Sequence, residues 1–298
     1  MKKLLKKIIF KIPSIKDLQQ YKTMWPPGHY YSPIPEEKNA LQIAEQSGQN
    51  TYKLNAVNLR EEAQLQMFDQ LVPFMKESIF RNEQKIEGQR FYNKNGTYGF
   101  SDALFLESMM RFLKPKRIIE AGSGLSSALM LDVNEKYFGN RIHIEFIEPY
   151  PSRLYTVLTD ADRKRVGLNI CGLQTMDLSF FKKLEKDDIL FIDSTHVAKS
   201  GSDLLYLFFE ILPVLQSGVY IHIHDIFNNF EYLPFHYHEN KGFAWNENYF
   251  LRAFLMYNQA FDVVLLTNFL DTKYRQHIES KMADYPFFTG AQFWMKKL

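Results

Sequence analysis

Cysteine is nearly absent from the 298-residue sequence, in which Cys171 is the only one. A single cysteine excludes a disulfide within the chain and a cysteine-rich zinc site. It lies in an apolar run, which favours a buried, inert thiol over a nucleophile. The shortage of cysteine suits a reducing compartment such as the cytoplasm.

The sequence also lacks a long hydrophobic run and an excess of charge. No stretch reaches the roughly 18 consecutive apolar residues of a membrane-spanning helix. Lys and Arg number 36 against 34 Asp and Glu, for a net charge of +2. Bulk charge therefore gives no reason to predict a nucleic-acid partner. The hydrophobic fraction of 46% and the 26 phenylalanines indicate an ordinary globular core.

The first 115 residues divide into an arm and a helical part. Residues 1–12 place leucine and isoleucine on one helical face and lysine mainly on the other. That pattern suits peripheral contact with an anionic membrane, and a solvated basic tail is the alternative. Residues 1–50 as a whole are expected to form a proline- and tyrosine-rich arm. Residues 51–115 are expected to form a helical cap, whose first helix begins at Asn58.

From residue 116 to residue 298, short apolar runs alternate with amphipathic ones. The runs are RIIEAG, RIHIEFIE, LNICGL, DILFID and GVYIHIHD, and helices are expected at 125–137, 153–159, 178–186 and 202–215. Near-continuous apolar strands separated by helices indicate a parallel sheet covered on both faces. The predicted fold class is therefore α/β.

A glycine turn, EAGSGLSS, follows the first predicted strand. Gly122 and Gly124 can adopt backbone angles closed to other residues and leave room for a ligand. The turn lacks the lysine of a phosphate loop, and Ser127 stands where a dinucleotide-binding turn has its third glycine. A tight turn with no ligand is the alternative. Glu148, at the end of the second strand, is suited to accept hydrogen bonds from ribose hydroxyls.

These residues, with Asp193 after the fourth strand and Asp225 after the fifth, resemble those of class I S-adenosylmethionine-dependent methyltransferases. The resemblance covers about residues 98–298, and Ser126 departs from it where many members carry a third glycine. It implies a Rossmann-like sheet of seven strands, in which FDVVLLTNF and GAQFWMKKL form a closing hairpin and the last strand is antiparallel. IEPYP, FIDSTHV and HIHDIF are similar to a subgroup found in bacterial sugar and polysaccharide modification.

The resemblance also implies which residues hold S-adenosylmethionine. The glycine turn would lie along the methionine part, Glu148 would hold the ribose, and the adenine would contact the turn at 174–177. The implied cofactor residues are Glu120, Gly122, Ser123, Gly124, Glu148, Asp177 and Asp193.

Acids and histidines gather where the fourth and fifth strands end. Ligands of open α/β sheets bind beyond the carboxyl ends of the strands, so Asp193, His224 and Asp225 are expected to meet and to suit a divalent metal. His196 is suited to remove a proton near neutral pH. Strand alternation places His222 further inside, as a core histidine.

The D-x-x-H pattern also resembles metal-dependent sugar O-methyltransferases of macrolide biosynthesis. By position, Asp193 and Asp225 would be magnesium ligands and His196 the base. His224 stands where that subgroup has a second acid, so it either shifts the preference toward a softer ion such as Mn²⁺ or acts as a base without metal. The alternative is that both aspartates merely cap helices and orient the cofactor.

The long loop at 227–248 is typical of a lid over an acceptor. Candidate acceptor contacts are Trp245 and Glu247 in this loop, Tyr98 before the domain, and His29 and Tyr30 in the arm. All of these side chains could instead pack the arm and loop against the domain.

The sequence therefore predicts a methyltransferase that acts on a hydroxyl of a sugar-containing or related bacterial metabolite, with a small-molecule or glycan acceptor. An NAD-dependent oxidoreductase is a rival, disfavoured because Glu120 precedes the glycines and the third glycine is missing. A non-catalytic module in polysaccharide assembly, held at a membrane by residues 1–12, is another.

Overall fold

A computed structural model describes residues 24–49, 54–80, 86–237, 244–283 and 290–298. The chain forms two compact units, one from residues 1–46 with 233–244 and one from residues 47–232 with 245–298. The proposed membrane-contact segment at residues 1–12 lies outside the described residues. Among the residues that are described, no helix is both long and apolar enough to cross a membrane.

The smaller unit contains an aromatic cluster followed by helix α3 (Glu37–Gln49). The rings of Trp25 and His29 stack with their centroids 4.3 Å apart, and those of Tyr30 and Tyr31 are 4.1 Å apart. Residues 24–36 of this unit are non-helical, in agreement with their prolines.

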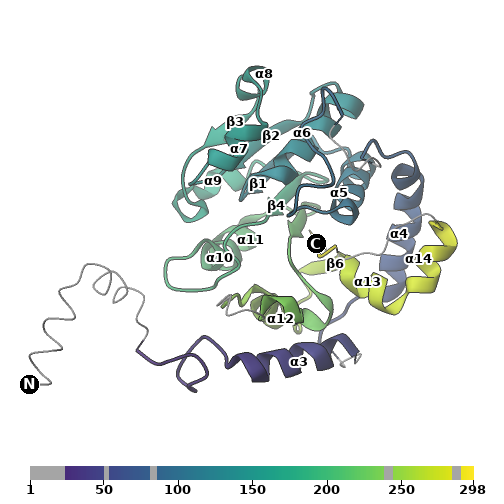
Figure 1. The fold of residues 1–298 in the computed structure, drawn as a ribbon. Coiled ribbons are helices and arrows are strands. Elements are labelled where there is room, and N and C mark those ends of the chain that lie inside the picture. The colour runs from purple at the N-terminus through teal and green to yellow at the C-terminus, as the bar shows by residue number, and fades with distance from the viewer. Residues whose placement is uncertain (1–23, 50–53, 81–85, 238–243, 284–289) are drawn as a thin grey trace, which may run out of the picture. The chain divides into compact units, whose positions relative to one another are not determined.

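The larger unit is built on a seven-stranded sheet (Figure 1). Its strands are β1 (Arg117–Ala121), β2 (His143–Ile147), β3 (Gly167–Asn169), β4 (Ile189–Ile192), β5 (Tyr220–Ile223), β6 (Phe261–Leu266) and β7 (Phe293–Lys297). Their order is β3-β2-β1-β4-β5-β7-β6, and β7 runs antiparallel to both neighbours. The predicted fold class and the antiparallel last strand are confirmed. The connection between β6 and β7 is not a tight hairpin, because it contains two helices.

The helices of the larger unit surround this sheet. They are α4 (Glu61–Lys76), α5 (Phe100–Leu113), α6 (Leu125–Phe138), α7 (Ser152–Val157), α8 (Asp160–Arg163), α9 (Leu178–Phe181), α10 (Asp203–Tyr206), α11 (Leu212–Val214), α12 (Glu247–Leu255), α13 (Thr267–Lys273) and α14 (Arg275–Lys281). Every residue of β4 and β5 is buried, as expected for central strands covered on both faces.

Local hydrogen bonds move several predicted helix ends. The helix expected from Asn58 begins three residues later, because the Asn58 side chain accepts a hydrogen bond from the Arg60 N–H at 3.0 Å and forms a turn. The helix expected over 178–186 ends at Phe181. The helix expected over 202–215 contains a π-helical turn at Leu207–Ile211.

A buried glutamine joins the helical cap to the sheet edge. Gln64 in α4 accepts a hydrogen bond from the Leu266 N–H of β6 at 2.7 Å, and its amide donates to the Leu59 carbonyl. The helices at 54–113 thus belong to the same compact unit as the sheet. The domain boundary placed near residue 115 stays a prediction.

A buried arginine links three acids on one side of the sheet. The Arg90 guanidinium donates to Asp132 of α6 at 2.7 Å and to Asp162 of α8 at 2.8 Å, and also reaches Glu135. Burial alone would raise the pKa of Asp162, but hydrogen bonds from Arg90 and Thr159 outweigh it and hold this pKa well below its usual range. The stabilisation from Asp162 is therefore present at neutral pH and is lost as the pH falls below about 4.

Replacing Arg90 with methionine should lower the free energy of unfolding by about 3–5 kcal/mol, because the buried carboxylates of Asp132 and Asp162 both lose the Arg90 guanidinium. Lys116→Met is the matched control. Its ion pair with Glu185 is exposed, at 85% and 59% for the two side chains, so it should cost about 1 kcal/mol or less. Denaturant unfolding at pH 7 measures the loss of stability in both variants. Equal losses would contradict the stabilising role given to Arg90.

Candidate functional site

A cavity of about 770 Å³ opens beyond the carboxyl ends of the parallel strands. Gly122 after β1, Glu148 after β2, Asp193 after β4 and Asp225 after β5 all line it. The structure therefore brings five of the seven predicted cofactor residues, Gly122, Ser123, Gly124, Glu148 and Asp193, into one space with the predicted acid–histidine cluster.

The glycine turn is fixed by its closeness to the next strand. Gly122 has a φ of +82°, and a Cβ built there would lie 1.7 Å from the Asp193 carbonyl oxygen. The Asp193 N–H in turn donates to the Ala121 carbonyl at 2.9 Å. Only glycine allows the ends of β1 and β4 to approach this closely.

Two serines follow the glycine turn and hold it in place. The hydroxyls of Ser126 and Ser127 both donate to the buried carboxyl of Glu120, and the Gly124 N–H donates to Ser127 Oγ at 2.9 Å. Burial raises the pKa of Glu120 to about 8. Glu120 thus supports the turn from below and does not line the cavity. The sequence EAGSGLSS contains all three residues, but their spacing alone does not show that both serines bind the Glu120 carboxyl.

Glu148 ties the end of β2 to the same turn. Its carboxylate accepts from the Ser123 N–H at 3.0 Å and from the Tyr150 N–H at 2.7 Å. Asp177, predicted near the adenine, does not line the cavity; it caps α9 by accepting from the Ser179 N–H at 2.8 Å. Gln174, in the predicted turn, does line it.

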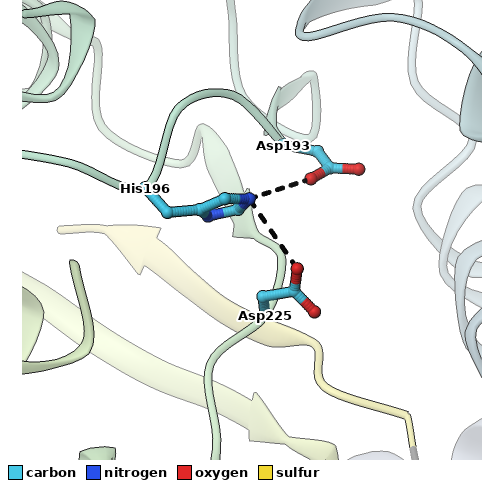
Figure 2. A group of neighbouring side chains, drawn as sticks. All are labelled: Asp193, His196 and Asp225. Carbon is cyan, nitrogen blue, oxygen red and sulfur yellow. Dashed lines mark ion pairs between the residues drawn. The ribbon is translucent and has the colours of Figure 1, made fainter. Parts of the chain in front are cut away.

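Two aspartates and a histidine form a compact group (Figure 2). His196 Nε2 lies 3.5 Å from Asp193 Oδ1 and 3.7 Å from Asp225 Oδ2. Ligand atoms that share a divalent cation at 2.0–2.6 Å are roughly 3–4 Å apart, so these residues fit a cation. The predicted metal set had His224 in place of His196. His224 Nε2 is 3.9 Å from Asp225 Oδ1 and is not a member of the group.

Glu247 does not contact the cavity as predicted but lies behind His196. Its Oε2 is 2.7 Å from His196 Nδ1, and both side chains are buried. His196 and Asp225 have left-handed backbone angles, with φ of 58° and 56°. Such angles are uncommon outside glycine and concentrate at functional sites.

Electrostatics couple the members of the site. Burial alone would lower the pKa of His196, but Asp193 and Glu247 outweigh it and raise this pKa well above its usual range. Burial would raise the pKa of Asp193, yet the positive charges of His224 and His196 lower it. Burial would likewise lower the pKa of His224, and Asp193, Asp225 and Asp102 raise it. The carboxylates and imidazoles of the site are therefore electrostatically coupled.

The other histidine of β5 behaves as the sequence predicted. His222 is buried against Phe191, whose ring stacks at 3.9 Å, and neither of its ring nitrogens has a hydrogen-bond partner within the described part of the chain. Burial lowers its pKa well below the usual range. His222 is therefore a neutral core side chain.

Aromatic rings border the acceptor side of the cavity. Tyr98 stacks on His224 with centroids 5.0 Å apart, Trp245 lies 4.4 Å from the His196 ring, and both line the cavity as predicted. His29 and Tyr30 belong to the other compact unit, so their role stays a prediction. The sequence analysis missed Arg153 and Lys199, which also line the cavity.

The strand order with its antiparallel last strand, the glycine turn and the acid after β2 define a class I S-adenosylmethionine-dependent methyltransferase. Comparisons agree with this class. Residues 119–226 match a family model described as "Methyltransferase domain". A curated relative from Archaeoglobus fulgidus, described as "Uncharacterized protein", is 32% identical over 171 residues, which are 56% of this chain and 76% of that protein. The chain belongs to the same family as this relative, and its residues 119–226 match the methyltransferase domain.

Two solved structures are more distantly similar. One is the SAH-bound methyltransferase PaMTH1 of Podospora anserina, at 14% identity and a TM-score of 0.43 over 93% of this chain and 99% of that one. The other is the O-methyltransferase TomG of Streptomyces achromogenes, at 11% identity and a TM-score of 0.41 over 89% of this chain and 99% of that one. These likenesses are too distant to carry an argument about substrate or mechanism.

Proposed function

We propose that the enzyme transfers the methyl group of S-adenosylmethionine to a hydroxyl of a small, sugar-containing or related bacterial metabolite. The observation that carries the proposal is the single cavity that joins the cofactor turn to the Asp193–His196–Asp225 group. Transfer to oxygen requires a residue that removes the hydroxyl proton, and this cavity supplies both carboxylates and imidazoles for that task.

The cofactor residues place the methyl group. Gly122 and Gly124 leave the turn open for the methionine part, and Glu148 accepts hydrogen bonds from the ribose. Asp193 lines the cavity together with both the glycine turn and Asp225, so it can face the positive charge of the cofactor. Fixing donor and acceptor together removes much of the entropic barrier to an in-line displacement.

The acceptor hydroxyl lies near the carboxylates in this proposal. A divalent cation such as Mg²⁺ or Mn²⁺, when held by Asp193 and Asp225, supplies Lewis-acid chemistry that lowers the pKa of that hydroxyl. His224 takes the proton, because both nitrogens of His196 already face carboxylates. The oxygen then bonds the methyl carbon as the sulfonium bond breaks, giving a methyl ether and S-adenosylhomocysteine.

Aromatic side chains favour a ring-shaped acceptor. Trp245 and Tyr98 both line the cavity close to the two histidines. The half-buried Trp245 ring offers a flat apolar surface that the face of a sugar ring can cover, while Tyr98, 3% exposed and stacked on His224, borders this space.

Calorimetric titration of the protein with S-adenosylmethionine and, separately, with NAD tests the cofactor. We expect binding of S-adenosylmethionine and a weakening of about tenfold or more in Glu148→Ala, since a good hydrogen bond to a charged group is worth about 1.5–3 kcal/mol. Glu185→Ala, which changes an exposed acid outside the cavity, is the control. A preference for NAD would refute the proposal and support an oxidoreductase.

The acceptor is tested by supplying methyl-labelled S-adenosylmethionine with nucleotide sugars and extracted bacterial glycans, with and without a chelator. Label in an alkali-stable ether is the expected product. Label only in amines would contradict O-methylation, and cofactor binding without transfer to any acceptor would favour the non-catalytic module.

A further inference from the structure

We propose that Glu247 is a positioning residue, which holds His196 with its hydrogen on Nδ1 and thereby makes Nε2 the third ligand of a divalent cation beside Asp193 and Asp225. The inference rests on the proposed function and deepens it, because it assigns His196 to cation binding and not to proton removal.

The first support is the contact between Glu247 and His196. Glu247 Oε2 lies 2.7 Å from His196 Nδ1, and the two side chains are only 1% and 7% exposed. An ionised carboxylate only accepts hydrogen bonds, so Nδ1 carries the hydrogen when Glu247 is charged. In neutral His196 the lone pair is then on Nε2, which points between the two aspartates (Figure 2).

The second support is that burying the Glu247 carboxylate at this position destabilises the folded protein. Its Oε1 is buried and has no hydrogen-bond partner within the described residues. A buried polar atom without a hydrogen-bond partner loses its hydration without compensation, which destabilises the folded protein. An uncharged side chain of similar size would fill the same space, so packing alone does not account for an acid.

The third support is the backbone on both sides of Glu247. The His196 carbonyl accepts from the N–H groups of Asn246 and Glu247, at 3.1 and 3.3 Å. The Asn248 amide donates to the Asp225 carbonyl at 2.8 Å. Three consecutive residues therefore hold both left-handed residues, His196 and Asp225, in place.

Asn246 and Asn248 also form hydrogen bonds with the loops that follow β4 and β5. The Asn246 side chain accepts from the Ala198 N–H at 2.6 Å, and that of Asn248 accepts from the Phe227 N–H at 2.9 Å. The segment from Asn246 to Asn248 thus connects the loop after β4 to the loop after β5.

This arrangement matches a recurrent feature of protein metal sites. A histidine ligand usually donates its second ring N–H to a carboxylate, which fixes its orientation and raises its basicity. Here one imidazole and two carboxylates would bind the cation from one side. A nitrogen ligand moves the preference from Mg²⁺ toward Mn²⁺ and later first-row ions.

Titration with Mn²⁺, followed by the magnetic resonance signal of the free ion, tests the proposal without an acceptor. The unaltered protein should bind Mn²⁺, and Glu247→Gln should weaken the binding by roughly 10- to 100-fold. Glu247→Asp tests whether the contact matters or only the charge. It keeps the negative charge, but its shorter side chain moves the carboxylate away from His196 Nδ1. We expect it to lose most of the affinity as well. Glu107→Gln removes a buried acid outside the cavity and should leave Mn²⁺ binding unchanged.

A spectrum of the unaltered protein keeps the proposal testable if the Glu247 variants do not fold. With ¹⁵N-labelled histidine and Zn²⁺ as a diamagnetic probe, Nε2 of His196 should show the shift of a metal-bound nitrogen while Nδ1 keeps its proton. A proton on Nε2, no binding of Mn²⁺, or unchanged affinity in either Glu247→Gln or Glu247→Asp would overturn the proposal. Failure of S-adenosylmethionine to bind would instead refute the proposed function.

Discussion

Gly122→Ala should abolish binding of S-adenosylmethionine, with a loss of affinity on the order of a hundredfold or more, as expected when binding groups shift by about 1 Å. The new methyl group would lie 1.7 Å from the Asp193 carbonyl oxygen, which is backbone and cannot rotate away. The ends of β1 and β4 must then separate, and both carry residues of the cavity. Calorimetry with S-adenosylmethionine measures the loss.

Gly88→Ala is the matched control for this substitution. Gly88 has a φ of +85°, close to the +82° of Gly122, and nothing lies within 4 Å of a Cβ built there. Both variants therefore carry the left-handed strain, about 1–2 kcal/mol, and only Gly122→Ala adds the collision. Affinity in Gly122→Ala equal to that in Gly88→Ala would show that the turn does not hold the cofactor.

The fold was largely predictable because the strand signals are strong. Short apolar runs such as DILFID, separated by amphipathic segments, indicate buried strands, and the intervening helices follow from the parallel sheet. Helix ends were less predictable, since they depend on single hydrogen bonds. The Asn58 side chain, for example, binds the Arg60 N–H and delays α4 by three residues.

The sequence indicated which residues lie at the site better than it indicated which of their side chains contact each other. Strand ends at one edge of a sheet must converge, which predicted Asp193, His196, His224 and Asp225 at one edge, with His224 and not His196 in the metal set. The contact of His196 with Glu247 joins residues 51 apart across a loop, and no local pattern encodes it. The exchange of His224 for His196 in the cation group has the same origin, because left-handed angles at His196 and Asp225 turn the side chains in ways that strand alternation does not predict.

These pairings give the two site histidines different tasks. His196 faces carboxylates with both nitrogens, so a cation or a proton must occupy the space at Nε2. His224 contacts the group only through Asp225, at 3.9 Å, and its ring is stacked on Tyr98. We therefore propose His224 as the base, which must first lose the proton that the neighbouring carboxylates favour.

His224→Asn should lower kcat for methyl transfer by roughly 10²- to 10⁴-fold, the usual contribution of a general base. Asparagine keeps a polar side chain of similar reach but cannot take up a proton near neutral pH. Because His224 is outside the cation group, binding of S-adenosylmethionine and of Mn²⁺ should stay within a few-fold of the unaltered protein. His196→Asn should differ by losing Mn²⁺ binding together with turnover.

His222→Leu is the matched control, since it changes the neighbouring histidine of β5 on the same face of the strand. It removes a buried ring whose nitrogens lack partners among the described residues, so thermal stability should be equal or higher. Turnover should stay close to that of the unaltered enzyme, because His222 does not line the cavity. Rates of methyl transfer from labelled S-adenosylmethionine to the identified acceptor compare the two variants with the unaltered enzyme. Full turnover in His224→Asn would transfer the role of base to His196 and would remove the reason for assigning the two histidines separate tasks.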